Sequence, residues 1–119
     1  MSVARLCANL DLALEKRKEL KLMDKTYNYM PQPVDVSDVV LPETLNPFIE
    51  ALAENVHETW AKGRVDAGWK YGQVRDEVNK RHPCLVPYCD LSESEKDYDR
   101  HTAISTLKFI CKMGFRILN

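Results

Sequence analysis

Residues 45–72, LNPFIEALAENVHETWAKGRVDAGWKYG, decide which fold this chain can adopt. Apolar side chains recur in this stretch at the three- and four-residue intervals of one helix face: Leu45, Phe48, Ile49, Leu52, Val56 and Trp60. We expect the helix to begin near Pro42 or Asn46, because Asn followed by Pro suits an N-cap and the first helical position. It should end around Ala67, where Gly68 can adopt the left-handed conformation that terminates helices.

Two further helices are expected on either side of this stretch. Ser92 and Glu95 have the spacing of a capping box, and Gly114 can end the helix that they begin. The core face of that helix should carry Tyr98, Ile104, Leu107, Ile110 and Cys111, and a short strand should follow over residues 115–118. Near the N-terminus a helix is predicted from Ser2 to about Leu22, with an apolar stripe of Val3, Leu6, Leu10, Ala13 and Leu14.

The two connecting segments differ in composition. Residues 24–41 contain Pro31 and Pro33, which favour extended geometry, so we expect an ordered arm along the domain surface that could include an edge strand. Residues 69–91 are rich in aromatic, charged and proline residues, and a loop of this length rarely lacks a structural or functional reason. Short strands and one or two turns of helix over residues 74–80 are expected there.

Length and charge limit the possible classes of protein. The 119 residues correspond to one domain, and 17 Lys and Arg against 18 Asp and Glu give a net charge of −1. Such a balance argues against a nucleic-acid polymer as partner, which requires a basic excess. The sequence has no apolar run long enough to span a membrane and no signal-peptide pattern, so we expect a cytoplasmic protein with four reduced cysteines.

No metal centre or catalytic constellation is expected. Cys84 and Cys89 lie close to His82, but Pro87 separates the two cysteines and no second ligand pair exists. A glycine-rich phosphate loop and a nucleophile elbow are both absent from the sequence. We therefore expect no enzyme, no cofactor and no metal.

Aromatic and cationic side chains are concentrated in one part of the chain. Trp60 and Arg64 share a helix face, and Trp69, Tyr71 and Arg75 follow at once. Aromatic faces beside guanidinium groups suit a planar heterocycle that carries phosphates. The alternative is that both tryptophans anchor the core while the arginines pair with nearby acids, for which the candidates are Glu58, Asp66 and Asp76.

The same stretch closely resembles the RyR domain, the repeat named after ryanodine receptors. The resemblance covers residues 27–119 and leaves residues 1–26 as an N-terminal helix and linker. It is carried by rare residues at fixed spacing: residues 52–61, Arg64, residues 68–72, Arg75, Asp76, residues 82–88, Leu91, residues 94–96, residues 98–100, Thr102 and Ala103, with residues 31–35, Leu41 and Pro42 as the entry segment. The sequence HPCLVPY at residues 82–88 is more similar to stand-alone prokaryotic and phage members than to the animal channel repeats.

The resemblance implies an α+β fold with two main helices packed against short antiparallel strands, here with an extra N-terminal helix. It also implies a non-catalytic ligand-binding or sensor module for an adenine nucleotide or a related small molecule, and leaves a role in phage–host conflict open. The implied pocket holds Trp60, Arg64, His82, Cys84 and Asp99, to which Trp69, Tyr71 and Arg75 are added as ligand-binding candidates.

Three points stay open at this stage. Channel repeats occur in pairs, so a lone repeat could form a homodimer, with the N-terminal helix as a cap or dimer element. A structural or protein-interaction domain without a small-molecule ligand is the alternative function. A nucleotide hydrolase that uses His82 and Asp99 as acid and base is the third.

Overall fold

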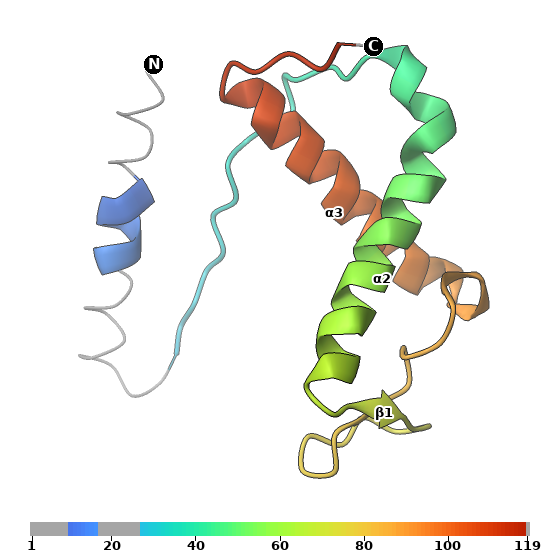
Figure 1. Cartoon of the computed structure of the whole chain (residues 1–119). Helices are drawn as coiled ribbons and strands as arrows, with labels where there is room; N and C mark the ends of the chain where they lie inside the picture. The colour runs from blue at the N-terminus through green and yellow to red at the C-terminus, as the bar shows by residue number, and fades with distance from the viewer. Residues whose placement is uncertain (1–9, 17–26, 119) are drawn as a thin grey trace.

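The computed structural model describes residues 10–16 and 27–118 of the chain. Two long helices and a two-stranded sheet form the domain, so the expected α+β class is confirmed (Figure 1). In chain order the elements are the 3₁₀ helix η1 (Glu43–Phe48), α2 (Ile49–Asp66), β1 (Lys70–Tyr71), β2 (Arg81–His82), the 3₁₀ helix η2 (Tyr88–Asp90) and α3 (Glu93–Lys112).

Local sequence signals set the ends of α2, with one correction at its start. The chain first forms the 3₁₀ helix η1 directly after Pro42, and Pro47 lies inside η1 rather than at the first position of an α-helix. Asn46 is therefore not the N-cap; its carbonyl accepts a hydrogen bond from the N–H of Ile49, where α2 begins. At the other end Gly68 has φ +91°, so the expected left-handed terminator is confirmed.

The Ser92 half of the expected capping box of α3 is present. The Ser92 hydroxyl accepts a hydrogen bond from the backbone N–H of Glu95. Gly114 ends the helix with φ +98°, and the N–H of Phe115 returns to the carbonyl of Ile110. The expected strand over residues 115–118 is absent, because this segment does not pair with another strand.

The strands pair in parallel, which corrects the expected antiparallel arrangement. Lys70 is paired with Arg81, and Tyr71 with His82. The chain reverses twice between the strands, and the second reversal carries an antiparallel bridge between Asp76 and Arg81. The Asp76 carboxylate accepts hydrogen bonds from the backbone N–H groups of the two residues 78 and 79, which fixes a turn where a helix was expected.

The core is small and lies between α2, η2 and the start of α3. Ala53, Tyr88 and Leu91 form its buried centre, with Cys84 and Val86 packed against it. Buried positions of α2 are Ala53 and His57, one residue further along the helix than Leu52 and Val56 of the expected stripe. On α3 the buried residue is Ala103, whereas Tyr98 is 71% exposed and is not part of the core face.

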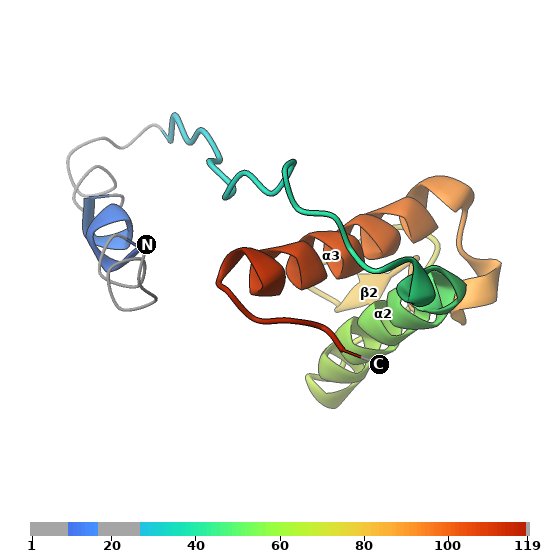
Figure 2. The same ribbon diagram turned by 90° about the horizontal axis from the view of Figure 1, so that it is seen from above.

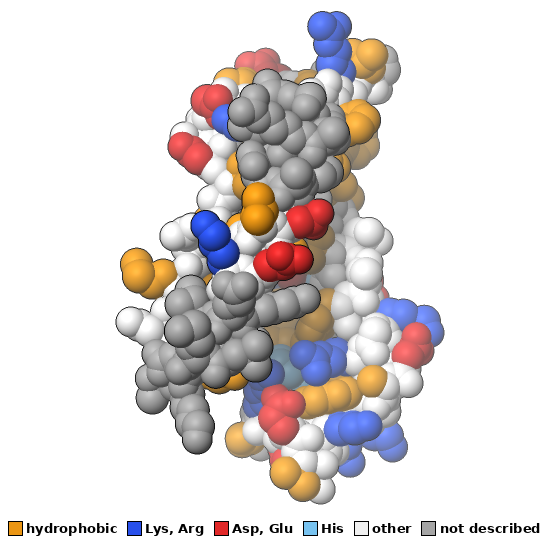
Figure 3. Space-filling view, turned by 90° about the vertical axis from the view of Figure 1, so that its left-hand side faces the viewer, with side chains coloured by type: hydrophobic (Ala, Val, Ile, Leu, Met, Phe, Trp, Pro, Cys, Tyr) orange, Lys and Arg blue, Asp and Glu red, His pale blue; other side chains and the backbone are white. Residues whose placement is uncertain are grey.

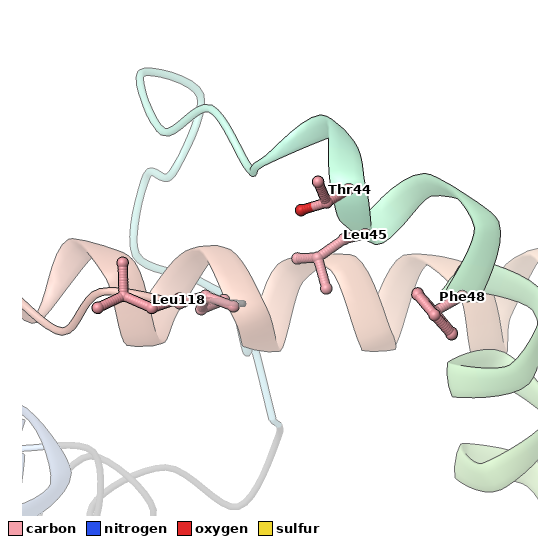
Figure 4. A pocket seen from close by; sticks show the side chains of 5 residues that line it. Thr44, Leu45, Phe48 and Leu118 are labelled. Carbon is pink, nitrogen blue, oxygen red and sulfur yellow. The ribbon is translucent and has the colours of Figure 1, made fainter.

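The segments outside the helices meet at the η1 end of the domain. Residues 27–42 contain no strand, and Asp38 binds Lys112 at the end of α3. The C-terminal tail packs against η1 around a hollow of about 80 Å³ (Figure 4), called here the η1–tail hollow and lined by Thr44, Leu45, Phe48, Ile117 and Leu118.

Residues 10–16 are helical, as the N-terminal stripe predicts, and they stand apart from α2 and α3 in both ribbon views (Figures 1 and 2). The remainder of the expected N-terminal helix, including Val3 and Leu6, lies outside the described residues. Among residues 10–16 and 27–118, no helix is both long and apolar enough to cross a membrane.

Replacing Ala53 should destabilise the domain because this side chain is 0% exposed and has no room to grow. The change Ala53→Leu should lower the free energy of unfolding by about 1–3 kcal/mol through overpacking. Thermal and urea unfolding would measure this loss. Ala51→Leu, at an exposed position of the same helix, is the matched control and should stay within about 0.5 kcal/mol of the original chain. Equal stability of the two variants would contradict the packing described here.

Candidate functional site

The turn that ends α2 positions Trp69. The backbone N–H of Trp69 donates to the carbonyl of Arg64, and the N–H of Gly68 donates to the carbonyl of Val65. These two hydrogen bonds form a Schellman motif. This turn brings the indole of Trp69 back over the last turn of the helix, where it is 7% exposed. The burial of Trp69 agrees with the alternative in which both tryptophans anchor the core.

Four of the expected site residues form one cluster, called here the tryptophan–histidine cluster: Trp60, Arg64, Trp69 and His82. The His82 ring lies edge-on to Trp60, with ring centroids 4.8 Å apart, and 6.3 Å from the Trp69 ring. The Arg64 guanidinium lies over Trp69, 4.8 Å from the ring centroid, and 5.9 Å from the Trp60 ring. Trp60 and Arg64 come from α2, Trp69 from the turn before β1, and His82 from β2.

The hydrogen bonds of His82 define its tautomer. Its Nδ1 accepts the backbone N–H of Cys84 at 3.0 Å, so the neutral ring carries its proton on Nε2. Burial lowers the pKa of His82 below its ordinary value, and the positive charges of Arg75 and Arg64 lower it further. The ring is therefore neutral at pH 7, with Nδ1 satisfied and Nε2 available as a donor.

Cys84 lies in the turn that follows β2, and Asp99 lies on α3. Burial raises the pKa of the Cys84 thiol, and the negative charge of Glu95 raises that pKa further. Burial likewise raises the pKa of Asp99, an effect that His57 partly offsets. Cys84 is therefore a protonated thiol at neutral pH rather than a nucleophilic thiolate.

His57 belongs to this site, and sequence reasoning missed it. The side chain is 3% exposed, and its Nε2 donates to the carbonyl of Val86 at 2.7 Å. Its Nδ1 faces the Asp99 carboxylate at 4.0 Å. The available signal was spacing, because positions 53, 57, 60 and 64 lie along one helix face that mixes polar and apolar residues.

The last two expected ligand-binding residues lie at the edge of the cluster. Tyr71 is 54% exposed on β1, so it is not a core residue. The Arg75 guanidinium donates to Glu77 at 2.7 Å, although its charge still acts on His82. Asp66 pairs with Lys62, so the ion pairs differ from those that the structural alternative suggested.

The surface around the cluster is basic. Residues 60–82 contain six Lys and Arg against three Asp and Glu: Lys62, Arg64, Lys70, Arg75, Lys80 and Arg81 against Asp66, Asp76 and Glu77. Figure 3 shows basic side chains gathered at the lower end of the molecule, where the loop between β1 and β2 lies in Figure 1. An anionic group approaching this end would experience a favourable field.

Within the described part of the chain, no three His, Cys, Asp or Glu residues are placed to hold a metal ion. The three described cysteines, Cys84, Cys89 and Cys111, are free. Cys7 lies outside the described residues.

The lowered pKa of His82 predicts a pH dependence of stability. The unfolded chain protonates this ring at about the ordinary value of 6.5, whereas the folded chain does so only at lower pH. Between these values the unfolded state binds more protons, so the stabilisation is complete above pH 6.5 and is lost as the pH falls towards the folded pKa. The variant His82→Asn keeps an acceptor for the Cys84 N–H and cannot titrate. Its melting temperature should therefore fall less than that of the original chain between pH 7.5 and 5.5.

Calorimetry or circular dichroism would provide the two profiles. The surface carboxylates with lowered pKa values do not interfere, since their contribution is lost only below their ordinary values of 3.8–4.5. Parallel profiles for the two proteins would show that His82 is not held neutral by its surroundings.

A protein-family model matches most of the chain. The model of the RyR domain matches residues 29–119, which is well over half of the chain and includes every element from η1 to α3. The matched region also contains the complete tryptophan–histidine cluster. The chain therefore belongs to the RyR domain family.

Proposed function

We propose that this domain is a non-catalytic, cytoplasmic ligand-binding or sensor module for an adenine nucleotide or a nucleotide-derived small molecule. The observation that carries the proposal is the tryptophan–histidine cluster, in which two indole rings, a neutral imidazole and a guanidinium meet beside a basic surface. The half-buried Trp60 indole can stack on a planar base, and the buried Trp69 ring supports Arg64, which can bind phosphate through two parallel hydrogen bonds. The proposal includes a role in phage–host conflict, on the resemblance of the sequence HPCLVPY at residues 82–88 to stand-alone prokaryotic and phage members.

The electrostatics of the cluster favour binding over catalysis. His82 has one nitrogen engaged by the Cys84 N–H, and Cys84 has a raised thiol pKa, so neither group is an activated nucleophile. Asp99 faces His57 rather than forming a pair with His82, which disfavours the hydrolase alternative. The η1–tail hollow, at about 80 Å³, is too small for a nucleotide, whose sites usually measure roughly 300–1,000 Å³.

Nucleotides should stabilise the protein against heat. In a thermal-shift series with AMP, ADP, ATP and cyclic nucleotides, the ligand that binds should raise the melting temperature in a concentration-dependent manner. A concentration of 100 times the Kd corresponds to about 2.7 kcal/mol of stabilisation. The variant Arg64→Gln should lose most of this shift because it removes the guanidinium that lies over Trp69.

Arg116→Gln provides the matched control, since Arg116 is exposed in the tail beyond α3. It should bind as the original chain does. A series in which no nucleotide shifts the melting temperature would favour the structural or protein-interaction alternative. Chromatography of the incubated nucleotide should recover it intact, and a hydrolysis product would overturn the non-catalytic assignment.

We also propose that the chain forms a homodimer through the N-terminal helical segment of one copy and the η1–tail hollow of the other. In support, Leu10 and Leu14 are 39% and 51% exposed, and Phe48 and Leu118 at the hollow are 58% and 83% exposed. These apolar groups gain by mutual burial, and such a contact repeats twice in a twofold dimer.

Light scattering at micromolar concentration should give twice the 13.7 kDa mass of the chain. Either Leu14→Glu or Phe48→Glu should give the monomeric mass, because each places a charge in the contact. Val78→Glu, at a 90% exposed position in the loop between β1 and β2, is the control and should remain dimeric. A monomeric mass for the original chain would exclude the dimer.

A further inference from the structure

The loop between β1 and β2 exposes apolar side chains to water. Val74 is 76% exposed and Val78 is 90% exposed, and Tyr71 at the end of β1 is 54% exposed. The loop lies beyond the end of α2 (Figure 1), and hydrophobic and basic side chains lie together at this end of the surface (Figure 3). Because contact between valine and water is unfavourable, the loop gains free energy when an apolar medium covers it.

Hydrogen bonds hold this loop in one conformation. The backbone N–H of Asp76 donates to the carbonyl of Arg81, and the N–H of Arg81 donates back to the carbonyl of Asp76, both at 2.9 Å. The Asp76 carboxylate also accepts the backbone N–H groups of Val78 and Asn79 and the side-chain amide of Asn79. The valines are therefore presented on a preformed turn, which loses little conformational entropy on binding.

Positive charges flank the two valines. In the part of the chain that the structure describes, Lys70, Lys80 and Arg81 form no ion pair with a carboxylate. Lys80 and Arg81 donate to backbone carbonyls instead. The Arg75 guanidinium, by contrast, is paired with Glu77 at 2.7 Å. The unpaired cations make this surface complementary to a negatively charged one.

We propose that this loop docks the domain on an anionic lipid surface, with Val74 and Val78 in the headgroup layer and Lys70, Lys80 and Arg81 against the anionic headgroups. An apolar tip flanked by cations supplies both contributions that hold peripheral proteins on such membranes, the burial of apolar area and the attraction of charge. The inference goes beyond the proposed nucleotide site and does not depend on it.

The size of the loop favours a lipid surface over a partner protein. A stable protein interface uses roughly 20–30 residues on each side. The loop between the strands, in contrast, contains only residues 72–80. A layer of lipid headgroups also adapts to a protruding tip, so it needs no pocket of complementary shape.

Sedimentation of the full chain with lipid vesicles tests the proposal. Phosphatidylcholine vesicles that contain one third phosphatidylserine should bind the chain at low salt. Vesicles of phosphatidylcholine alone should bind it at least about tenfold more weakly, because each cation near an anionic membrane contributes about fivefold in affinity. High salt should weaken the binding to the anionic vesicles in the same direction.

The contribution of the valines is measured with the double variant Val74→Ser and Val78→Ser. It should bind the anionic vesicles at least about tenfold more weakly, since complete burial of one valine side chain already corresponds to about that factor. Val40→Ser is the matched control, because Val40 is likewise 90% exposed but lies in the arm before η1. It should bind as the original chain does.

Three outcomes would overturn the proposal. The first is equal binding of the original chain and the double variant to the anionic vesicles, and the second is equal binding of the original chain to both kinds of vesicle. The third is absence of binding to the anionic vesicles, which would leave an acidic protein as the partner that suits this loop. None of these outcomes affects the proposed nucleotide site, which the thermal-shift series tests without lipid.

Discussion

The hydrogen bond from the His57 imidazole to the Val86 carbonyl is the interaction on which the site depends. It joins α2 to a segment 29 residues further along the chain that has neither helix nor strand of its own. Breaking it would leave a polar group without a partner in a part-buried region, which typically costs about 1–3 kcal/mol. Because Val86 and Cys84 both pack against the core, this bond also fixes the turn that carries His82 beside Trp60.

Around this contact, ion pairs and hydrogen bonds on the surface add to the packing of a small core. Arg100 on α3 donates to the carboxylate of Glu50 on α2 and to Glu93 and Asp97 on its own helix. The Tyr88 hydroxyl also donates to Glu50, so one carboxylate connects α2, η2 and α3. Exposed ion pairs are individually weak and are screened by salt, so the apolar cluster and the His57 bond set the packing while this network aligns the two helices.

Sequence could predict those features that depend on near neighbours in the chain. The N-cap at Ser92 and the terminators Gly68 and Gly114 are confirmed, because each is settled within a few residues of backbone. The spacing of Trp60 and Arg64 likewise placed them on one face. The predictions that were wrong depend on residues far apart in the chain. The parallel direction of β1 and β2 follows from the two reversals of the loop between them. The exposure of Tyr98 follows from which side of α3 packs against α2.

Within the site, too, the features that sequence reasoning missed depend on residues far apart in the chain. His57 was missed because a buried histidine is explained only by its acceptor 29 residues away, and that separation has no periodic signature. The pKa shifts of His82 and Cys84 were equally invisible, since burial is their largest cause and depends on the packing of the whole domain.

The two ends of α2 have different roles in the architecture. Its last turns carry two residues of the tryptophan–histidine cluster, whereas the tail at residues 115–118 packs against η1, which precedes its first turn (Figure 1). The helix has 18 residues and is about 27 Å long, so the two regions lie towards its opposite ends. A neighbouring module attached through the tail would leave the cluster unobstructed. The packed pair of α2 and α3 is the part of the domain that connects these two regions.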